Sequence, residues 1–374
     1  MKKLLLLIIC LLPFKVFALA DSAKSNILID YNTGSIITEN NSDEELPMAS
    51  MTKMMTLLII MERIDSSKIK LTDMVPISEN AASMGGSQIY LEAGTRMSLD
   101  TLLRAICIAS ANDATVAVAE YIAGSTGEFV RLMNEKAVSL GLKHTNFKNV
   151  HGLDDEGHYS SAHDMAFIAR ELLRHELILQ YSSIYEDYIK HPDGTNTWIV
   201  NTNKLINYYD GLDGLKTGFT KNSGYCITAT AKRGNMRLIS VVMGEENNSI
   251  RNQDTMELLN YGFANYKMET IIPSKNNIGS VNIAFGKKDK VDLKLMSDVE
   301  DLVNINEEND YTYEIIKEEI KAPVYVGDIV GKLVVYANDT KINEYDLTVK
   351  ESVLKANIFD LYIKNLKRLL KGYN

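Results

Sequence analysis

The stretch PMASMTKMMTLLIIMERI, residues 47–64, decides the fold of the N-terminal part of this chain. After its proline it is an apolar run without glycine or proline, too long for a strand, which predicts a largely buried helix. Ser50 stands at the start of that helix, and Lys53 follows on the same face, within reach of the serine hydroxyl. The pair has two interpretations: a helix N-cap beside a lysine, or a nucleophile with its base one helical turn away.

Two further motifs follow in the order that Ser-Lys acyl enzymes use, S-x-N at Ser110–Asn112 and K-T-G at Lys216–Gly218. Ser110-Ala111-Asn112 interrupts an apolar helical stretch, residues 98–123, with polar groups that are costly to bury without a purpose. Each motif alone also fits a cap or a satisfied buried amide. Together, in this order and these settings, they favour an acyl-enzyme site.

The first two motifs have other copies in the chain, and their settings differ. Ser67–Lys70 lies in a polar connection, and Ser352–Lys355 lies in a basic tail, where no pocket is expected. Ser78–Asn80 is not embedded in an apolar helix. Ser50 and Ser110 are therefore the serines predicted to belong to the site.

The remaining patterns predict two folded parts. Residues 26–38 carry a hairpin signal around Asn32-Thr33-Gly34, and residues 161–180 and 252–266 have helical periodicity. From Gly211 the runs GLKTGFT, YCITATAKR and RLISVVMG predict an antiparallel meander. After Pro273, alternation at period two predicts a small separate β domain.

The two ends of the chain differ from its body. Residues 1–20 have the charged, apolar, small-residue order of a secretory signal, which predicts export. Its removal takes the formal net charge from −9 to −12, because three lysines and no acid are lost. A body this acidic argues against nucleic acid as a partner. In the tail, residues 352–374, apolar residues recur at three- and four-residue spacing among basic ones, which predicts a basic amphipathic helix. Such a helix attaches to an anionic membrane surface or, alternatively, docks on the body of the protein.

Neither the cysteines nor the histidines predict a cofactor site. Cys107 and Cys226 are too few for a disulfide framework and resemble buried apolar residues, although an exported protein can pair them. His151, His158 and His163 lie near acids without a zinc-binding motif, so loop hydrogen bonds explain them better than a metal. We expect no metal and no organic cofactor.

At these motifs the chain resembles the penicillin-binding serine D-alanyl-D-alanine carboxypeptidases of low molecular mass, which carry a β-rich C-terminal domain. The likeness is dense over roughly residues 25–265 and rests on PMASMTKMMT, GGSQIYLEAGTRMSLDTLLRAICIASANDA, VHGLDDEGHYSSAHDM and GLDGLKTGFT. It implies a transpeptidase- or β-lactamase-like α/β domain, with an antiparallel sheet flanked by helices and a helical subdomain. A small all-β domain and an amphipathic C-terminal helix should follow. The expected boundaries are 1–20 for the signal, 21–275 for the catalytic domain, 276–350 for the β domain and 351–374 for the anchoring helix.

The resemblance also implies roles for individual residues. Ser50 would attack the carbonyl between two D-alanines of a peptidoglycan stem, Lys53 would accept its proton and Ser110 would relay a proton to the leaving amine. β-Lactams would be covalent inhibitors, and the enzyme would act at the outer face of the cytoplasmic membrane. The remaining implied roles concern binding. Asn112 would hold the substrate amide, and Lys216 and Thr217 would hold the terminal carboxylate with help from Arg251. The backbone N–H groups of Ser50 and of Phe219, which follows Gly218, would form the oxyanion hole.

One departure and two alternatives stay open. Phe219 stands where members of the family often carry a polar or imidazole side chain, which puts substrate preference and deacylation rate in doubt. A class A β-lactamase would share the three motifs, but the chain has no E-x-x-L-N loop between S-x-N and K-T-G. A non-hydrolytic module that binds peptidoglycan or senses β-lactams would keep the same residues if deacylation were slow.

Overall fold

The computed structural model describes residues 19–317 and 320–371, and it divides into two compact units that meet in sequence at Tyr261 and Gly262. Two short turns, Asp30–Ser35 and Arg233–Arg237, are grouped with the second unit. We refer to the units as the N-terminal and the C-terminal unit. Except for Leu19 and Ala20, the predicted signal lies outside the described residues.

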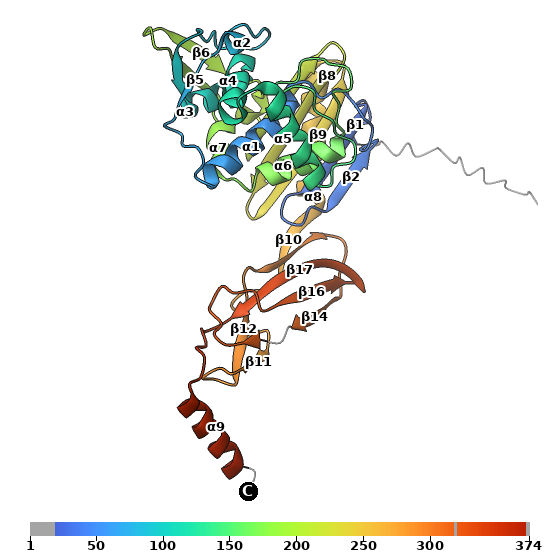
Figure 1. Cartoon of the computed structure of the whole chain (residues 1–374). Helices are drawn as coiled ribbons and strands as arrows, with labels where there is room; N and C mark the ends of the chain where they lie inside the picture. Colours follow the sequence, from blue (N-terminus) through green and yellow to red (C-terminus); the bar gives the residue numbers. More distant parts are fainter. Residues whose placement is uncertain (1–18, 318–319, 372–374) are drawn as a thin grey trace, which may run out of the picture. The chain divides into compact units, whose positions relative to one another are not determined.

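A five-stranded sheet forms the centre of the N-terminal unit, in the order β2-β1-β9-β8-β7. The hairpin and the meander predicted from the sequence are both present, and they meet where β1 lies beside β9. Figure 1 shows helices α1, α5 and α6 against this sheet. The strands are β1 Ser25–Asp30, β2 Ile36–Asn40, β7 Leu212–Thr220, β8 Gly224–Arg233 and β9 Met236–Glu245.

The apolar run predicted as a buried helix is α1, Lys53–Asp65, preceded by a 3-10 turn at Ala49–Thr52. Nine consecutive residues from Lys53 to Met61 are buried, as a helix without a polar face requires. The predicted break in the next helical stretch is a π-helical turn, Ala105–Ala109, which ends at Ser110 in the left-handed conformation. The other helices of this unit are α2 Glu79–Ala82, α3 Leu99–Arg104, α4 Asn112–Ala123, α5 Thr126–Ser139, α6 Ala162–Leu172, α7 Leu177–Ser182 and α8 Asn248–Asn265.

Two short hairpins complete the N-terminal unit. Strands β3 (Met74–Pro76) and β4 (Arg96–Ser98) pair with each other, and β5 (Glu186–Lys190) pairs with β6 (Asn196–Val200). The sequence analysis did not predict either hairpin. The α/β class with an antiparallel sheet, flanking helices and a helical subdomain is confirmed.

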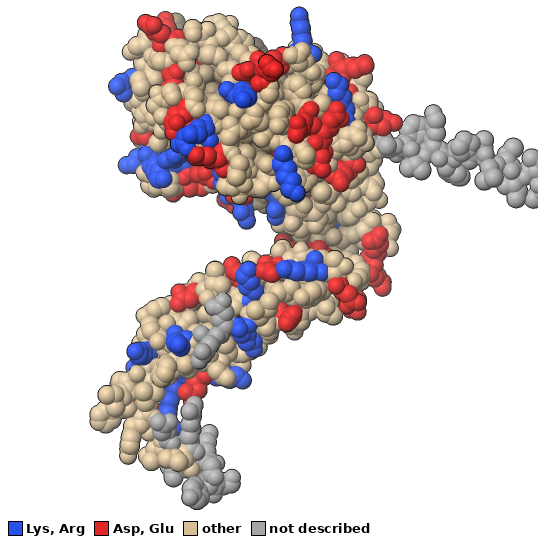
Figure 2. Space-filling view, turned by 45° about the vertical axis from the view of Figure 1, so that its right-hand side comes forward, with Lys and Arg blue, Asp and Glu red and all other residues tan. Residues whose placement is uncertain are grey.

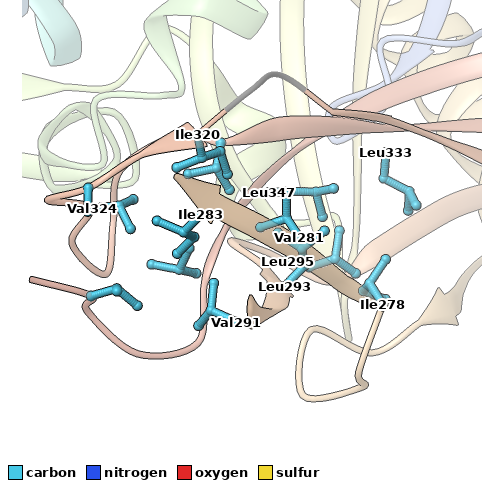
Figure 3. Close-up of a cluster of buried hydrophobic side chains, with 14 of the residues drawn as sticks. Ile278, Val281, Ile283, Val291, Leu293, Leu295, Ile320, Val324, Leu333 and Leu347 are labelled. Atoms are coloured by element: carbon cyan, nitrogen blue, oxygen red, sulfur yellow. The ribbon is translucent and has the colours of Figure 1, made fainter. Parts of the chain in front are cut away.

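The C-terminal unit is a β domain with an apolar core. Its larger sheet has the order β14-β16-β17-β12-β11-β15, and β10 pairs with β13. Figure 3 shows the core, to which several strands contribute valine, leucine and isoleucine side chains. The strands are β10 Tyr266–Ile272, β11 Ser280–Ala284, β12 Lys290–Leu295, β13 Val299–Asn304, β14 Tyr311–Lys317, β15 Ile320–Lys321, β16 Gly331–Ala337 and β17 Thr340–Val349.

Two elements begin at other residues than the patterns predict. Strand β10 starts at Tyr266, ahead of the expected start at 276, because it pairs with β13 of the same unit. Helix α9, Ile358–Lys371, starts later than residue 352. The reason is that Val353 pairs with Val324 and is buried in the β-domain core. Among the described residues no helix has the length and apolar character needed to cross a bilayer.

Candidate active site

A cleft in the N-terminal unit brings together side chains from distant parts of the chain. Six of the predicted site residues line it: Ser50, Ser110, Thr217, Gly218, Phe219 and Arg251. The sequence analysis did not name four further lining residues, which are Ser87, Thr202, Tyr225 and Asn248. Lys53, Asn112 and Lys216 are buried beside this cleft.

Lys53 and Ser50 form the centre of the site. The lysine Nζ lies 3.0 Å from Ser50 Oγ, 2.7 Å from Asn112 Oδ1 and 2.6 Å from the carbonyl oxygen of His151. The amide orientation of Asn112 is determined, because its Nδ2 donates to the carbonyl oxygen of Gly85 at 2.8 Å. Asn112 Oδ1 and His151 O are therefore pure acceptors, and they take two N–H groups of the lysine.

Burial and a neighbouring charge favour the neutral form of Lys53. Its pKa is lowered well below the usual lysine value, chiefly by complete burial and then by the charge of Lys216. Asp113 acts in the opposite direction. A neutral amine has two N–H groups and one lone pair. With both N–H groups engaged by Asn112 and His151, the lone pair is directed at the hydroxyl proton of Ser50.

Ser110 supplies a second hydroxyl. It has a left-handed backbone, with φ of 60°, and its buried Oγ has no hydrogen-bond partner among the described residues. Both features are unfavourable in a folded protein and are typical of functional positions. The S-x-N motif thus places in the cleft a hydroxyl without a partner among the described residues, and it places the amide oxygen of Asn112 against Lys53.

The K-T-G strand β7 forms one wall of the cleft. Thr217 Oγ1 donates to Thr202 Oγ1 at 2.8 Å, and Phe219 is half-exposed with its ring 4.3 Å from that of Tyr225. Gly218 is needed for close approach: a Cβ there would lie 2.7 Å from Met48 O and 3.2 Å from Ser50 N. The absence of a side chain at Gly218 lets β7 lie directly against the Ser50 turn.

Two buried cations, Lys216 and Arg251, and the buried amine of Lys53 lie around the cleft without an ion-pair partner in the described part of the chain. Burial lowers the pKa of Lys216 to about 8 and that of Arg251 to about 10. Arg251 is held by the side-chain amide oxygens of Asn248 and Asn252. Buried cations are normally paired, so this group is suited to receive a carboxylate from outside the protein.

The loop with the sequence H-G-L-D, residues 151–154, packs against the Ser50 turn and contacts strand β7. Asn149 Oδ1 accepts the N–H of Gly152 at 2.7 Å, and Asp154 Oδ1 accepts the hydroxyl of Thr220 at 2.7 Å. Gly152 has φ of 94°, and a Cβ there would lie 2.0 Å from Ala49 O. Loop hydrogen bonding was predicted for His151 from the sequence, whereas Gly152 was missed, although the motif itself contained the signal.

The competing motif copies have other contacts. Ser78 is the N-cap of α2, accepting the N–H of Ala81, and its hydroxyl donates to Glu120 at 2.6 Å. Ser352 Oγ accepts the N–H of Val326 in the β domain, and Ser67 is exposed. Cys107 and Cys226 are both free and buried. In the described part of the chain no group of three His, Cys, Asp or Glu is placed to hold a metal ion.

The site combines a serine, a desolvated lysine beside it and buried cations that can bind a carboxylate. This combination is typical of Ser-Lys acyl-transfer enzymes. Comparison with known proteins identifies the family. Residues 14–247 match the peptidase S11 family of D-alanyl-D-alanine carboxypeptidases, and residues 266–355 match the C-terminal domain of penicillin-binding protein 5. The chain belongs to the D-alanyl-D-alanine carboxypeptidase family and has that enzyme's activity, which confirms the resemblance found in the sequence.

Individual relatives agree with this assignment. The chain is 45% identical to the D-alanyl-D-alanine carboxypeptidase DacF of Bacillus subtilis over 94% of its own length and 90% of the relative's. It superposes on penicillin-binding protein 5 from Haemophilus influenzae with a TM-score of 0.74 and 34% identity, covering 89% of this chain and 98% of the other. Penicillin-binding protein D2 from Listeria monocytogenes, in its ampicillin-bound form, matches with a TM-score of 0.58 and 30% identity, over 65% and 98% of the two chains.

Proposed function

We propose that Ser50 is the nucleophile of this carboxypeptidase and Lys53 the base that activates it. The observation that carries the proposal is the engagement of both Lys53 N–H groups by Asn112 and the His151 carbonyl, with Ser50 Oγ at 3.0 Å from Nζ. Lys53 would accept the hydroxyl proton as Ser50 Oγ bonds to the carbonyl carbon of the penultimate D-alanine.

The other groups complete a balanced reaction. The amide C–N bond breaks, the leaving D-alanine nitrogen takes a proton through the Ser110 hydroxyl, and water later cleaves the ester to free Ser50. Lys216 and Arg251 bind the terminal carboxylate, which their uncompensated charge favours, together with the hydroxyl of Thr217. We assign the oxyanion to the backbone N–H groups of Ser50 and Phe219, and the substrate amide to Asn112.

The same attack accounts for β-lactam binding. A β-lactam presents an acyl carbon and a carboxylate, so Ser50 would open its ring and remain acylated. The ampicillin-bound relative supports this expectation for the present chain. Phe219, stacked on Tyr225 at the cleft wall, is the first residue to vary if deacylation proves slow.

D-Alanine release from a peptide ending in D-Ala-D-Ala tests the assignment. We expect release by the protein comprising residues 20–357 and none by its Ser50→Ala variant, while Ser67→Ala behaves as wild type. Fluorescent penicillin should label wild type and Ser67→Ala only. Labelling of Ser50→Ala would refute the nucleophile, and labelling without D-alanine release would indicate the non-hydrolytic module instead.

The peptidoglycan substrate places the reaction outside the cytoplasm, and we propose attachment to the membrane surface through α9. Its apolar side chains, including Ile358, Phe359 and Leu369, are exposed. The segment from residue 352 carries a net charge of +4 by sequence, which complements anionic lipid. Deletion of residues 358–374 should abolish sedimentation with anionic phosphatidylglycerol vesicles but preserve D-alanine release; continued sedimentation would refute the anchor. Deletion from residue 352 is a poorer test because it removes buried Val353.

We further propose that the export signal is cut before Ala20 instead of after it. Ala20 is buried, and its carbonyl oxygen accepts the side-chain N–H of Asn26 at 2.9 Å. A cut after Ala20 would leave the buried Asn26 amide without this acceptor. N-terminal sequencing of the exported protein should therefore find Ala20 still present; a chain beginning with Asp21 would contradict this.

A further inference from the structure

The peptide group between Ala49 and Ser50 is tightly confined. A Cβ on Gly152 would lie 2.0 Å from Ala49 O and 2.9 Å from Ser50 N, and a Cβ on Gly218 would lie 3.2 Å from Ser50 N. Ala49 has φ of 48°, an unfavourable left-handed value for a residue with a side chain. Two glycines therefore leave room for this peptide group, but they provide no side chain that holds its orientation.

The orientation is held by Thr52. Its buried Oγ1 donates a hydrogen bond of 2.8 Å to Ala49 O. In a planar trans peptide the C=O and N–H bonds point in opposite directions. Fixing the carbonyl oxygen of Ala49 therefore fixes the direction of the Ser50 N–H.

His158 determines where the Thr52 proton points. Its Nε2 lies 2.8 Å from Thr52 Oγ1, and its Nδ1 accepts the backbone N–H of Lys148 at 3.0 Å. Because Nδ1 is an acceptor, the imidazole carries its proton on Nε2 and donates to the threonine oxygen. The Thr52 hydroxyl then has its own proton left for Ala49 O. Burial lowers the pKa of His158 to about 4, so the ring is neutral at ordinary pH.

The geometry points to Thr52 and His158 as positioning residues that hold the Ser50 N–H in place as an oxyanion donor. This inference rests on the proposed function and adds to it two residues that do not touch the substrate. The N–H matters most when charge develops on the oxygen, so its misorientation slows acylation more than it weakens substrate binding. We therefore expect kcat to change and KM to stay nearly constant.

Thr52→Val tests the inference, because it removes the hydroxyl and keeps the side-chain shape. Loss of a whole oxyanion donor costs about 10²–10³-fold in kcat, so we expect a loss of about 10–100-fold for a misoriented one. Thr52→Ser, which keeps a hydroxyl, should recover most of the rate. The readouts are kcat and KM for D-alanine release, the rate constant for acylation by penicillin, and the melting temperature.

Thr56→Val is the matched control. Thr56 is a buried residue on the next turn of α1, and its hydroxyl donates to the carbonyl oxygen of Val150 at 2.8 Å. It loses the same chemical group, so it should show a comparable drop in melting temperature but wild-type acylation. Equal losses of acylation in Thr52→Val and Thr56→Val would overturn the inference, as would an unchanged rate in folded Thr52→Val.

A second pair of variants keeps the inference testable if Thr52→Val does not fold. His158→Gln retains an N–H donor near the Nε2 position, whereas His158→Asn retains only an acceptor near Nδ1. We expect faster acylation by the glutamine variant, and the reverse order would overturn the role of His158. Penicillin acylation also distinguishes failure of this inference from failure of the proposed function. Acylation stays measurable even if the wild type releases no D-alanine. Labelling of Ser50→Ala would reject Ser50 as the nucleophile.

Discussion

The two units differ in the charged groups that they bury. The N-terminal unit buries Lys53, Lys216 and Arg251 without carboxylate partners in the described part of the chain. The C-terminal unit has a core of valine, leucine, isoleucine and alanine; lysines such as Lys332 form ion pairs at its surface, and its buried Asp301 accepts the Tyr311 hydroxyl. Figure 2 shows acidic and basic side chains interspersed over the visible faces. Unpaired buried charge destabilises a fold, so its concentration around one cleft marks where chemistry was favoured over stability.

Backbone conformation also differs between the two units. In the N-terminal unit Ala49 and Ser110 hold left-handed φ values, and Ala49 directly precedes the proposed nucleophile Ser50. In the C-terminal unit, positive φ at Asn338 and Asp339 belongs to the turn between β16 and β17, where such residues adopt it readily. At the site, by contrast, Ala49 opens the 3-10 turn Ala49–Thr52 and Ser110 ends the π-helical turn Ala105–Ala109, so these left-handed residues lie at helix ends and line or adjoin the cleft.

Lys53→Met should have the largest effect. We expect D-alanine release to fall by about 10²–10⁴-fold, the usual contribution of a general base. Methionine has a similar length but leaves the acceptors Asn112 Oδ1 and His151 O without their lysine donor, so the melting temperature should fall modestly. Lys332→Met in the C-terminal unit is the control, with activity unchanged. Normal release by Lys53→Met would contradict its role as the base, and an equal loss of release in Lys332→Met would show that the two units do not differ as argued.

Gly152→Ala should come next. Its Cβ would collide with Ala49 O, and its φ of 94° is left-handed, so we expect a loss of roughly 2–4 kcal/mol in unfolding free energy together with slow acylation. Gly94→Ala has nearly the same φ, 81°, with nothing within 4 Å, and isolates the backbone cost. Urea unfolding and penicillin acylation measure both. Equal losses in the two variants would show that the contact with Ala49 is unimportant.

Leu333→Ala tests whether the C-terminal core affects the acylation of Ser50. Leu333 is fully buried in that core, so the truncation should cost about 2–5 kcal/mol. The loss should appear in the unfolding of the C-terminal unit, measured by calorimetry, while Ser50 is acylated at the wild-type rate. A parallel drop in acylation would mean that the site depends on that core.

The smallest predicted effect concerns pH. Lys216 has a pKa near 8, so its charge is present below that value and lost above it. KM for the peptide should therefore rise as pH passes from about 7 to about 9, with kcat less affected, because the neutral amine no longer attracts the terminal carboxylate. Arg251, with a pKa near 10, limits the loss. Steady-state kinetics across this range would contradict the assignment if KM stayed flat.

Much of this protein follows from its sequence. The apolar run after Pro47 forms a buried helix, the runs from Gly211 form the meander, and Ser50, Ser110 and Lys216 come together as the order of their motifs predicts. These predictions are correct because the periodicity of apolar side chains and the identity of turn residues determine local structure. The errors lie at boundaries: β10 and the segment around Val353 belong to the β domain through pairing with distant strands, which local pattern does not contain.

The sequence by itself therefore determined which elements form and which residue types supply the chemistry. Only the tertiary structure decided their state: the lowered pKa of Lys53, the orientation of Asn112, the Ser110 hydroxyl without a partner among the described residues, and the hydrogen bond from Thr52 to Ala49. The physical reason is that desolvation and hydrogen-bond direction depend on atoms brought close in space from Gly85, His151 and His158. The spacing of residues along the chain does not determine those distances.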